Sequence, residues 1–229
     1  MRTLSRQYET VTNLYIQAKL QFHTILDQIF PEYRGVFGDL FSKVSKAAKL
    51  MTSAKRNPFQ QGVYESQLFS LDMYITMLLQ YQEHLSSLEW QIDVLAEEIE
   101  ECKIIQSIPG IGEKIAATII SEIGEIDRFN HPKKLVAYAG IDPSVHSSGK
   151  FTATINHITK RGSSRLRHAL YMAVLCGIRS SRNKKLKEYY DRKRNEGKPS
   201  KVAMIACVNK LLHWIFAILK RNDQFLDLA

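Results

Sequence analysis

The chain has 229 residues, of which 45% are hydrophobic and 24% charged, and its formal net charge is +9. That length suits one large domain or two small ones, and the composition is that of a folded protein. The three cysteines lie far apart without a Cys-x-x-Cys pair, which argues against a disulfide framework and a zinc site. No apolar signal segment follows Met1, so the cytoplasm is the expected compartment.

The positive charge is concentrated in the second half of the chain. Residues 131–229 contain 20 Lys and Arg against 6 Asp and Glu, whereas residues 1–130 contain 12 against 17. Such an asymmetry indicates a polyanionic partner, most simply nucleic acid. An anionic membrane surface would require a basic amphipathic helix or a lipidation signal, and the sequence shows no clear example of either. The apolar run 202–219 contains Asn209, Lys210 and His213, so it is predicted to be a core helix with Trp214 and Phe216 in the core, rather than a membrane span.

The first half of the chain carries two apolar seams, 4–29 and 68–99, whose members alternate by steps of three and four. This spacing predicts two long helices and a coiled-coil arm over residues 1–102. An antiparallel hairpin is favoured, and parallel pairing with another chain is the alternative. A short helix is expected over about 40–54. The acidic cluster within 97–101 is interpreted as a solvated helix end rather than a metal site.

A glycine-rich turn at 107–112 precedes an apolar helical pattern that ends near Gly124. Gly110 and Gly112 permit positive φ angles and a close approach of another backbone. The first N–H groups of the following helix lie at its positive end, where phosphate binds favourably. The pattern is typical of a helix–hairpin–helix that grips the DNA backbone, although the same pattern also occurs in helical corners without a ligand.

Further elements are predicted along the basic half. A helix is expected to begin near Pro132, after Asn130 or His131, and to end at Gly140. Residues 141–150 are interpreted as an irregular polar loop and 151–155 as a short extended segment. The next helix should be capped by Ser163 or Ser164.

Five motifs then occur in a fixed order: Pro109-Gly-Ile-Gly, Ala139-Gly-Ile-Asp-Pro, Ser148-Gly-Lys, Ile158-Thr-Lys-Arg-Gly and Leu166-Arg-His-Ala-Leu-Tyr. In this order they resemble the C-terminal domain of insertion-sequence transposases of the IS110/IS116 type. The resemblance covers roughly residues 105–221, and the first half resembles the coiled coil that precedes this domain. The implied fold is mainly α: a long coiled-coil helical hairpin over 1–102, then a compact domain over 103–229 that contains the helix–hairpin–helix.

The resemblance implies DNA transposition in which a serine attacks a DNA phosphate and forms a covalent phosphoserine link. The family pattern maps this nucleophile onto Ser148, with Ser147 as the runner-up. A serine hydroxyl must be activated, and cations stabilise the negative charge of a phosphoryl transition state. The predicted DNA-binding residues are Gly110, Gly112, Lys114, Lys150, Lys160, Arg161, Arg165, Arg167, Arg182, Lys184 and Lys185.

Family members begin with an RNase-H-like domain, whose four acidic residues hold divalent metal and which takes part in binding a structured guide RNA. The sequence shows no such domain, so Mg²⁺ is expected only with that domain, and the chain is interpreted as a truncated or split transposase, inactive on its own. The expected partners are DNA, a guide RNA and further copies of the chain through the coiled coil. The alternative function is a non-catalytic helix–hairpin–helix DNA-binding module on a coiled-coil oligomerisation arm. A purely structural oligomerisation protein is the third possibility.

Overall fold

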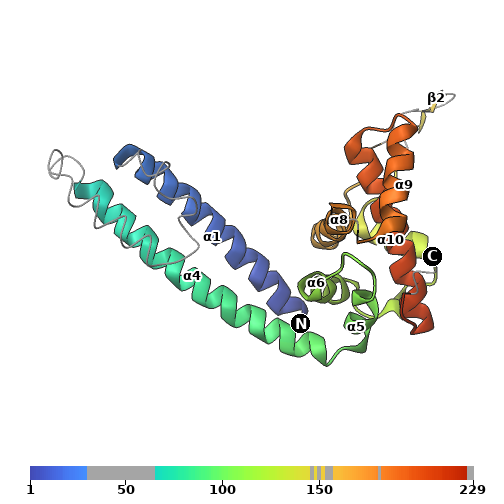
Figure 1. Ribbon diagram of the computed structural model, residues 1–229, viewed down its shortest axis with the longest axis horizontal. Helices are drawn as coiled ribbons and strands as arrows, with labels where there is room; N and C mark the ends of the chain where they lie inside the picture. Colours follow the sequence, from blue (N-terminus) through green and yellow to red (C-terminus); the bar gives the residue numbers. More distant parts are fainter. Residues whose placement is uncertain (30–64, 145–146, 149–150, 153–156, 180–181, 226–229) are drawn as a thin grey trace. The chain divides into compact units, whose positions relative to one another are not determined.

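The computed structural model describes residues 1–29, 65–144, 147–148, 151–152, 157–179 and 182–225. These residues are mainly helical (Figure 1), which confirms the predicted fold class. The chain divides into two compact units, one formed by residues 6–90 and the other by residues 1–5 together with 91–229. The helix expected over about 40–54 lies outside the described residues.

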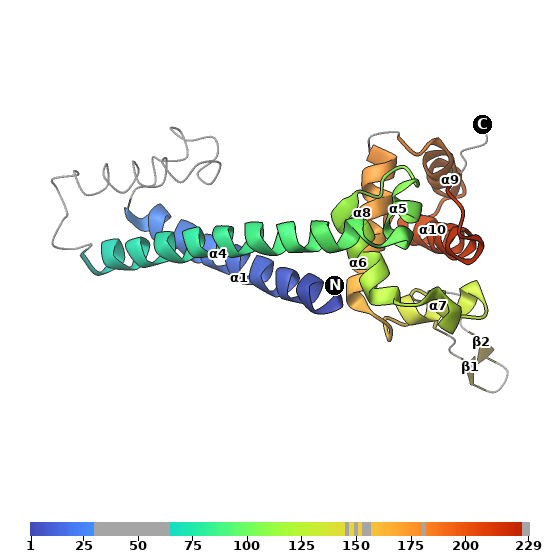
Figure 2. The same cartoon turned by 90° about the horizontal axis from the view of Figure 1, so that it is seen from below.

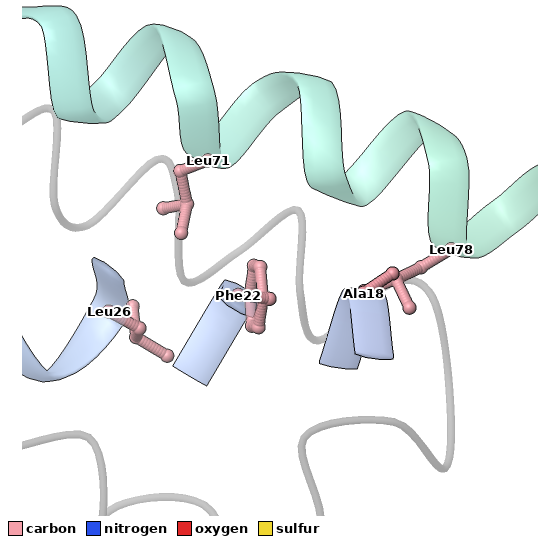
Figure 3. Packing of buried hydrophobic residues seen from close by; sticks show 5 residues of the cluster. All are labelled: Ala18, Phe22, Leu26, Leu71 and Leu78. Carbon is pink, nitrogen blue, oxygen red and sulfur yellow. The ribbon is translucent and has the colours of Figure 1, made fainter. Parts of the chain in front are cut away.

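The described residues of the first unit form two antiparallel helices, α1 (Arg2–Ile29) and α4 (Glu65–Glu97) (Figures 1 and 2). Their facing sides bury Phe22 and Leu26 of α1 together with Leu71 and Leu78 of α4 (Figure 3). Burial of apolar side chains spaced three and four residues apart stabilises the packing of two long helices. Tyr74 and Tyr81 of α4 are partly buried against the same cluster.

Gln82 and Glu89, two polar residues of α4, each bond to a tyrosine of α1. The Gln82 side-chain amide donates a hydrogen bond to the Tyr15 hydroxyl at 2.9 Å, and the Tyr8 hydroxyl donates to a Glu89 carboxylate oxygen at 2.6 Å. Polar groups at seam positions select one register because any shift leaves them unpaired. Both bonds join α1 to α4, as expected for an antiparallel hairpin of these two helices.

The second unit is built on two long helices, α8 (Ser164–Arg179) and α10 (Ser200–Arg221). The other helices of this unit are α5 (Glu100–Gln106), α6 (Glu113–Ile123), the 3-10 turn η1 (Ile126–Arg128), α7 (Pro132–Ala139) and α9 (Lys184–Asn195). α8 contacts α6, α7, α9 and α10, while α10 also contacts α5 and α7 (Figure 2).

By length and composition α10 could cross a membrane, but it packs as a core helix of this unit. Its buried residues include Cys207, Leu212 and Ile215. The prediction that Trp214 and Phe216 lie in the core needs correction, because both side chains are only half-buried. They lie beside the innermost stripe of the helix, which is formed by residues spaced three and four apart.

Helix ends follow the predicted capping chemistry. The Pro132 helix begins after His131, whose Nδ1 accepts from the Lys133 N–H at 3.2 Å, and it ends at Gly140 with φ +66°. Ser163 rather than Ser164 caps α8, since its Oγ accepts from the Leu166 N–H at 3.2 Å. These caps satisfy N–H groups that have no partner within their own helix.

Two short strands, β1 (Ser147–Ser148) and β2 (Phe151–Thr152), pair in antiparallel fashion. Ser147 is opposite Thr152 and Ser148 is opposite Phe151. Ser147 and Ser148 therefore lie in a strand, not in the irregular loop that the sequence predicted. The extended segment predicted to begin at Phe151 agrees with β2, and residues 153–155 lie outside the described residues.

Candidate nucleic-acid interface

The glycine-rich turn between α5 and α6 is pressed against α8. Gly110 has φ +106°, and a Cβ placed on it would lie 2.8 Å from both the Ala173 carbonyl oxygen and the Gly177 Cα. The close approach that glycine permits at this position is therefore to the protein's own backbone. Gly112 differs: it is exposed, and nothing lies within 4 Å of where its Cβ would be.

A buried asparagine fastens this turn to α9. The Asn183 side-chain amide donates to the Pro109 carbonyl at 3.1 Å, while its Oδ1 accepts from the Leu186 N–H at 3.0 Å and so caps α9. Asn183 is 1% exposed. One side chain therefore links the turn to the basic helix α9, a role that the sequence analysis missed.

Gly112 leads into the N-terminus of α6, which has no side-chain cap. Gly112, Glu113 and Lys114 are all exposed there. The geometry is compatible with phosphate binding through backbone N–H groups. In the described structure, Gly110 serves packing, whereas Gly112 and Lys114 stay open to solvent.

The two segments that lead to β1 and β2 are joined at their base by backbone atoms. Gly140 at the end of α7 lies against Gly162: a Cβ on Gly140 would be 2.6 Å from the Gly162 nitrogen. The Lys160 N–H donates to the Gly140 carbonyl at 3.0 Å, and the Ser163 N–H donates to the Tyr138 carbonyl at 2.8 Å. Neither glycine can carry a side chain without moving this contact.

The joined segments continue as a short ladder. Thr159 donates twice to Asp142, from its N–H to the carbonyl at 2.9 Å and from its hydroxyl to the carboxylate at 2.7 Å. The Ser144 N–H donates to the His157 carbonyl at 2.7 Å. We call residues 140–144 with 157–162 the ribbon base. It holds the two chain segments between which Ser147 and Ser148 lie.

A buried carboxylate lies beside the ribbon base. Glu122, at the end of α6, is 2% exposed, and one of its carboxylate oxygens accepts from the Ser163 hydroxyl at 3.0 Å. Its backbone carbonyl accepts from Tyr138 at 3.0 Å and from Arg2 at 2.8 Å. A buried carboxylate requires hydrogen-bond donors, and the Ser163 hydroxyl supplies one. Glu122 therefore ties α6 to the start of α8, and no motif in the sequence indicated this role.

The predicted cations divide into two groups by environment. Lys114, Lys160, Arg161, Arg182 and Lys184 are exposed, whereas Arg165, Arg167 and Lys185 are half-buried, and Lys150 lies outside the described residues. The Arg167 guanidinium donates to the Ala139 carbonyl at 2.9 Å. Arg167 therefore uses at least one of its five N–H donors to hold the end of α7, next to the ribbon base.

Within the part of the chain that the structure describes, no three His, Cys, Asp or Glu side chains form a group that could hold a metal ion. The described residues therefore offer no such group of ligands. Burial raises the pKa of the Cys102 and Cys207 thiols to about 11. Both thiols remain protonated near neutral pH and are poor metal ligands.

The comparison with protein families places this site in context. Residues 102–191 match the model of the Transposase IS116/IS110/IS902 family. This segment contains the glycine-rich turn, the ribbon base, both candidate serines and most of α9.

Individual relatives agree with this match. The chain is 30% identical over 156 residues to the transposase for insertion sequence element IS1111A of Coxiella burnetii, covering 68% of this chain and 43% of that protein. It is 30% identical over 137 residues to the pilin gene-inverting protein of Moraxella bovis, covering 59% and 42%. The chain thus spans less than half the length of these relatives. These matches confirm the resemblance inferred from the five motifs: residues 102–191 are those of an IS116/IS110/IS902-type transposase domain.

Proposed function

We propose that this chain acts on DNA during transposition and that Ser148 is its nucleophile. The observation that carries the proposal is the ribbon base, in which two family motifs, Ala139-Gly140-Ile141-Asp142-Pro143 and Ile158-Thr159-Lys160-Arg161-Gly162, hold the segments that carry Ser147 and Ser148. The match of residues 102–191 to a transposase family supports DNA as the substrate.

In the proposed reaction the Ser148 Oγ attacks a DNA phosphorus atom. One Oγ–P bond forms, one P–O bond to a deoxyribose oxygen breaks, and that oxygen leaves as a hydroxyl once it gains a proton, while Oγ loses its own. The transition state spreads negative charge over the phosphate oxygens. Lys160 and Arg161, which are exposed on the ribbon base, are suited to stabilise that charge.

The remaining exposed cations fit contacts with the DNA backbone away from the reacting phosphate. Arg182 and Lys184 lie at the start of α9, and Lys114 lies at the start of α6. Such contacts supply affinity and position the protein but do not read sequence. We further propose that Mg²⁺ comes with the acidic domain of the family rather than with this chain.

The test is a covalent-adduct assay. The full chain is incubated with end-labelled DNA and Mg²⁺, the acidic domain of a family member is added in trans, and labelled protein is sought on a denaturing gel. We expect an adduct with the unaltered chain and with Ser147→Ala, and none with Ser148→Ala. An adduct that persists in Ser148→Ala contradicts the assignment of the nucleophile.

Duplex binding by each variant is measured in parallel by fluorescence anisotropy. Ser148→Ala should bind duplex DNA as the unaltered chain does, because removing one hydroxyl leaves the phosphate contacts in place. Binding of DNA with no adduct under any condition would favour the alternative function, a DNA-binding module without catalysis.

We further propose that the chain self-associates through its arm and binds a guide RNA. On the arm, Leu20, Phe69 and Trp90 are 61%, 75% and 67% exposed. These side chains are open to contact with another copy of the chain. Light scattering of the chain, alone and with Phe69→Glu, tests self-association, and a monomer at all concentrations contradicts it.

A further inference from the structure

A hollow of about 460 Å³ lies between α9 and α10, lined by Tyr189, Ala206, Asn209, Lys210 and His213. The two helices lie side by side (Figure 1). Its volume is within the range of pockets that hold small organic ligands. None of these five residues is among the residues predicted from the family motifs.

Cations surround the aromatic ring of this hollow. The Lys210 ammonium lies 4.6 Å from the centre of the Tyr189 ring and 5.3 Å from that of Trp214. The Arg192 guanidinium lies 4.9 Å and the Lys193 ammonium 5.6 Å from the Tyr189 ring centre. The contact with two rings holds Lys210 over the hollow instead of leaving it extended in solvent.

This cluster has an excess of positive charge. Lys193 pairs with Glu196 at 2.8 Å, but among the described residues neither Arg192 nor Lys210 has an acidic partner within ion-pair distance. Like charges gathered around one ring repel each other, and a bound anion relieves that repulsion. The charge therefore favours an anionic ligand.

The combination of an aromatic ring, two hydrogen-bonding side chains and unpaired cations matches the chemistry of one nucleotide. The base can lie against Tyr189 and Ala206 once it displaces the Lys210 ammonium from the Tyr189 ring. Asn209 and His213 can then bond the edge of the base, and the flexible Lys210 side chain and Arg192 can reach its phosphate. Aromatic stacking combined with a positive groove is how proteins hold unpaired bases. A base within a duplex is already stacked on both faces and cannot enter.

We propose that the hollow between α9 and α10 binds one unpaired nucleotide of a nucleic-acid strand. The inference rests on the proposed function only in taking nucleic acid as the ligand, and it does not involve Ser148. The site holds a strand close to the basic helix α9 through stacking, whereas the exposed cations at the start of α9 contact the backbone only.

The experiment measures binding of the full chain to fluorescent oligothymidylate, to oligouridylate and to duplex DNA by anisotropy. Tyr189→Leu removes the ring, and Tyr189→Phe keeps it. Tyr190→Leu is the matched control, because Tyr190 is the next residue on α9, does not line the hollow, and has its hydroxyl 2.9 Å from that of Ser200. Cooperative thermal melting of each variant confirms that it is folded.

We expect Tyr189→Leu to weaken single-strand binding by about tenfold or more, while Tyr189→Phe and Tyr190→Leu bind as the unaltered chain and duplex binding changes little. Lys210→Gln should lower the slope of log affinity against log salt by about 0.7 for a single strand. Comparing the affinities for oligothymidylate and oligouridylate shows whether the strand is DNA or RNA.

Equal single-strand binding by Tyr189→Leu and Tyr190→Leu would overturn the inference. So would a chain that binds duplex DNA but no single strand, and that outcome would leave the proposed function intact. Conversely, the adduct assay tests Ser148 and does not depend on Tyr189. Either proposal can therefore fail while the other stands.

Discussion

Glycine residues in this chain serve two different purposes, and the structure separates them at neighbouring positions. Gly110 has a positive φ and meets the backbone of α8, whereas Gly112 has φ −89° and faces open space. The sequence pattern predicts a close approach at both positions but does not say which partner approaches. Only the position of α8, which begins at Ser164, far along the chain, resolves this.

Gly110→Ala should therefore destabilise the second unit by about 3 kcal/mol, because a Cβ there combines backbone strain with overlap. Gly112→Ala should cost less than about 1 kcal/mol, which is the scale of removing a glycine cap. The measurement is urea unfolding followed by Trp214 fluorescence in a Trp90→Phe background, which leaves one tryptophan in the chain.

The same two variants test whether the start of α6 binds DNA phosphate. If backbone N–H groups at the start of α6 contact DNA, Gly112→Ala weakens duplex binding while the protein stays folded. Equal stability of the two variants would contradict the packing role of Gly110, and unchanged duplex affinity in Gly112→Ala would contradict phosphate binding at the start of α6.

At the scale of elements, the start of α8 depends on one hydroxyl. The Ser163 Oγ accepts from the Leu166 N–H and donates to the buried carboxylate of Glu122. It therefore joins α6 to α8 as well as capping a helix. Ser164, the next residue, is the first residue of α8, and its side chain is not the cap.

Ser163→Ala should lower the free energy of unfolding of this unit by about 2–3 kcal/mol, the sum of removing a cap and removing a donor to a buried carboxylate. Ser164→Ala serves as the control and should change it by less than about 0.5 kcal/mol. Unfolding in urea, monitored by Trp214 in the Trp90→Phe background, gives both values. A similar decrease in the two variants would mean that Ser163 is not the cap.

Element boundaries were predictable where local chemistry sets them. Pro132, Gly140, Gly124 and the serine before α8 gave the correct helix ends, because caps and left-handed residues act within one turn. The ribbon base was missed because it brings Gly140 against Gly162, and such long-range backbone contacts leave no periodic signal. Glu122 and Asn183 were missed for the same reason: their partners lie far away in sequence.

At the scale of the whole molecule, charge is divided between the halves of the chain, and duplex binding should follow that division. Neutralising exposed cations in the basic half should reduce the salt dependence of duplex binding by about 0.9 in slope for each phosphate that the protein no longer neutralises. The variants are Arg182→Gln and Lys184→Gln, and Lys19→Gln on α1 is the control.

Anisotropy titrations at several salt concentrations give these slopes. An equal change for Lys19→Gln would mean that the arm also contacts the DNA backbone. No change for Arg182→Gln and Lys184→Gln would place the DNA on another face of the second unit.

The ribbon base has a consequence for how this site can change. Most of its joining bonds run between backbone atoms, from Lys160 to Gly140, from Thr159 to Asp142 and from Ser144 to His157. Backbone bonds do not depend on side-chain identity, so substitutions between residues 144 and 157 should leave these bonds in place. The segment between Ser144 and His157 is thus an exchangeable module. A different serine-bearing loop grafted between these two residues would be held by the same backbone hydrogen bonds.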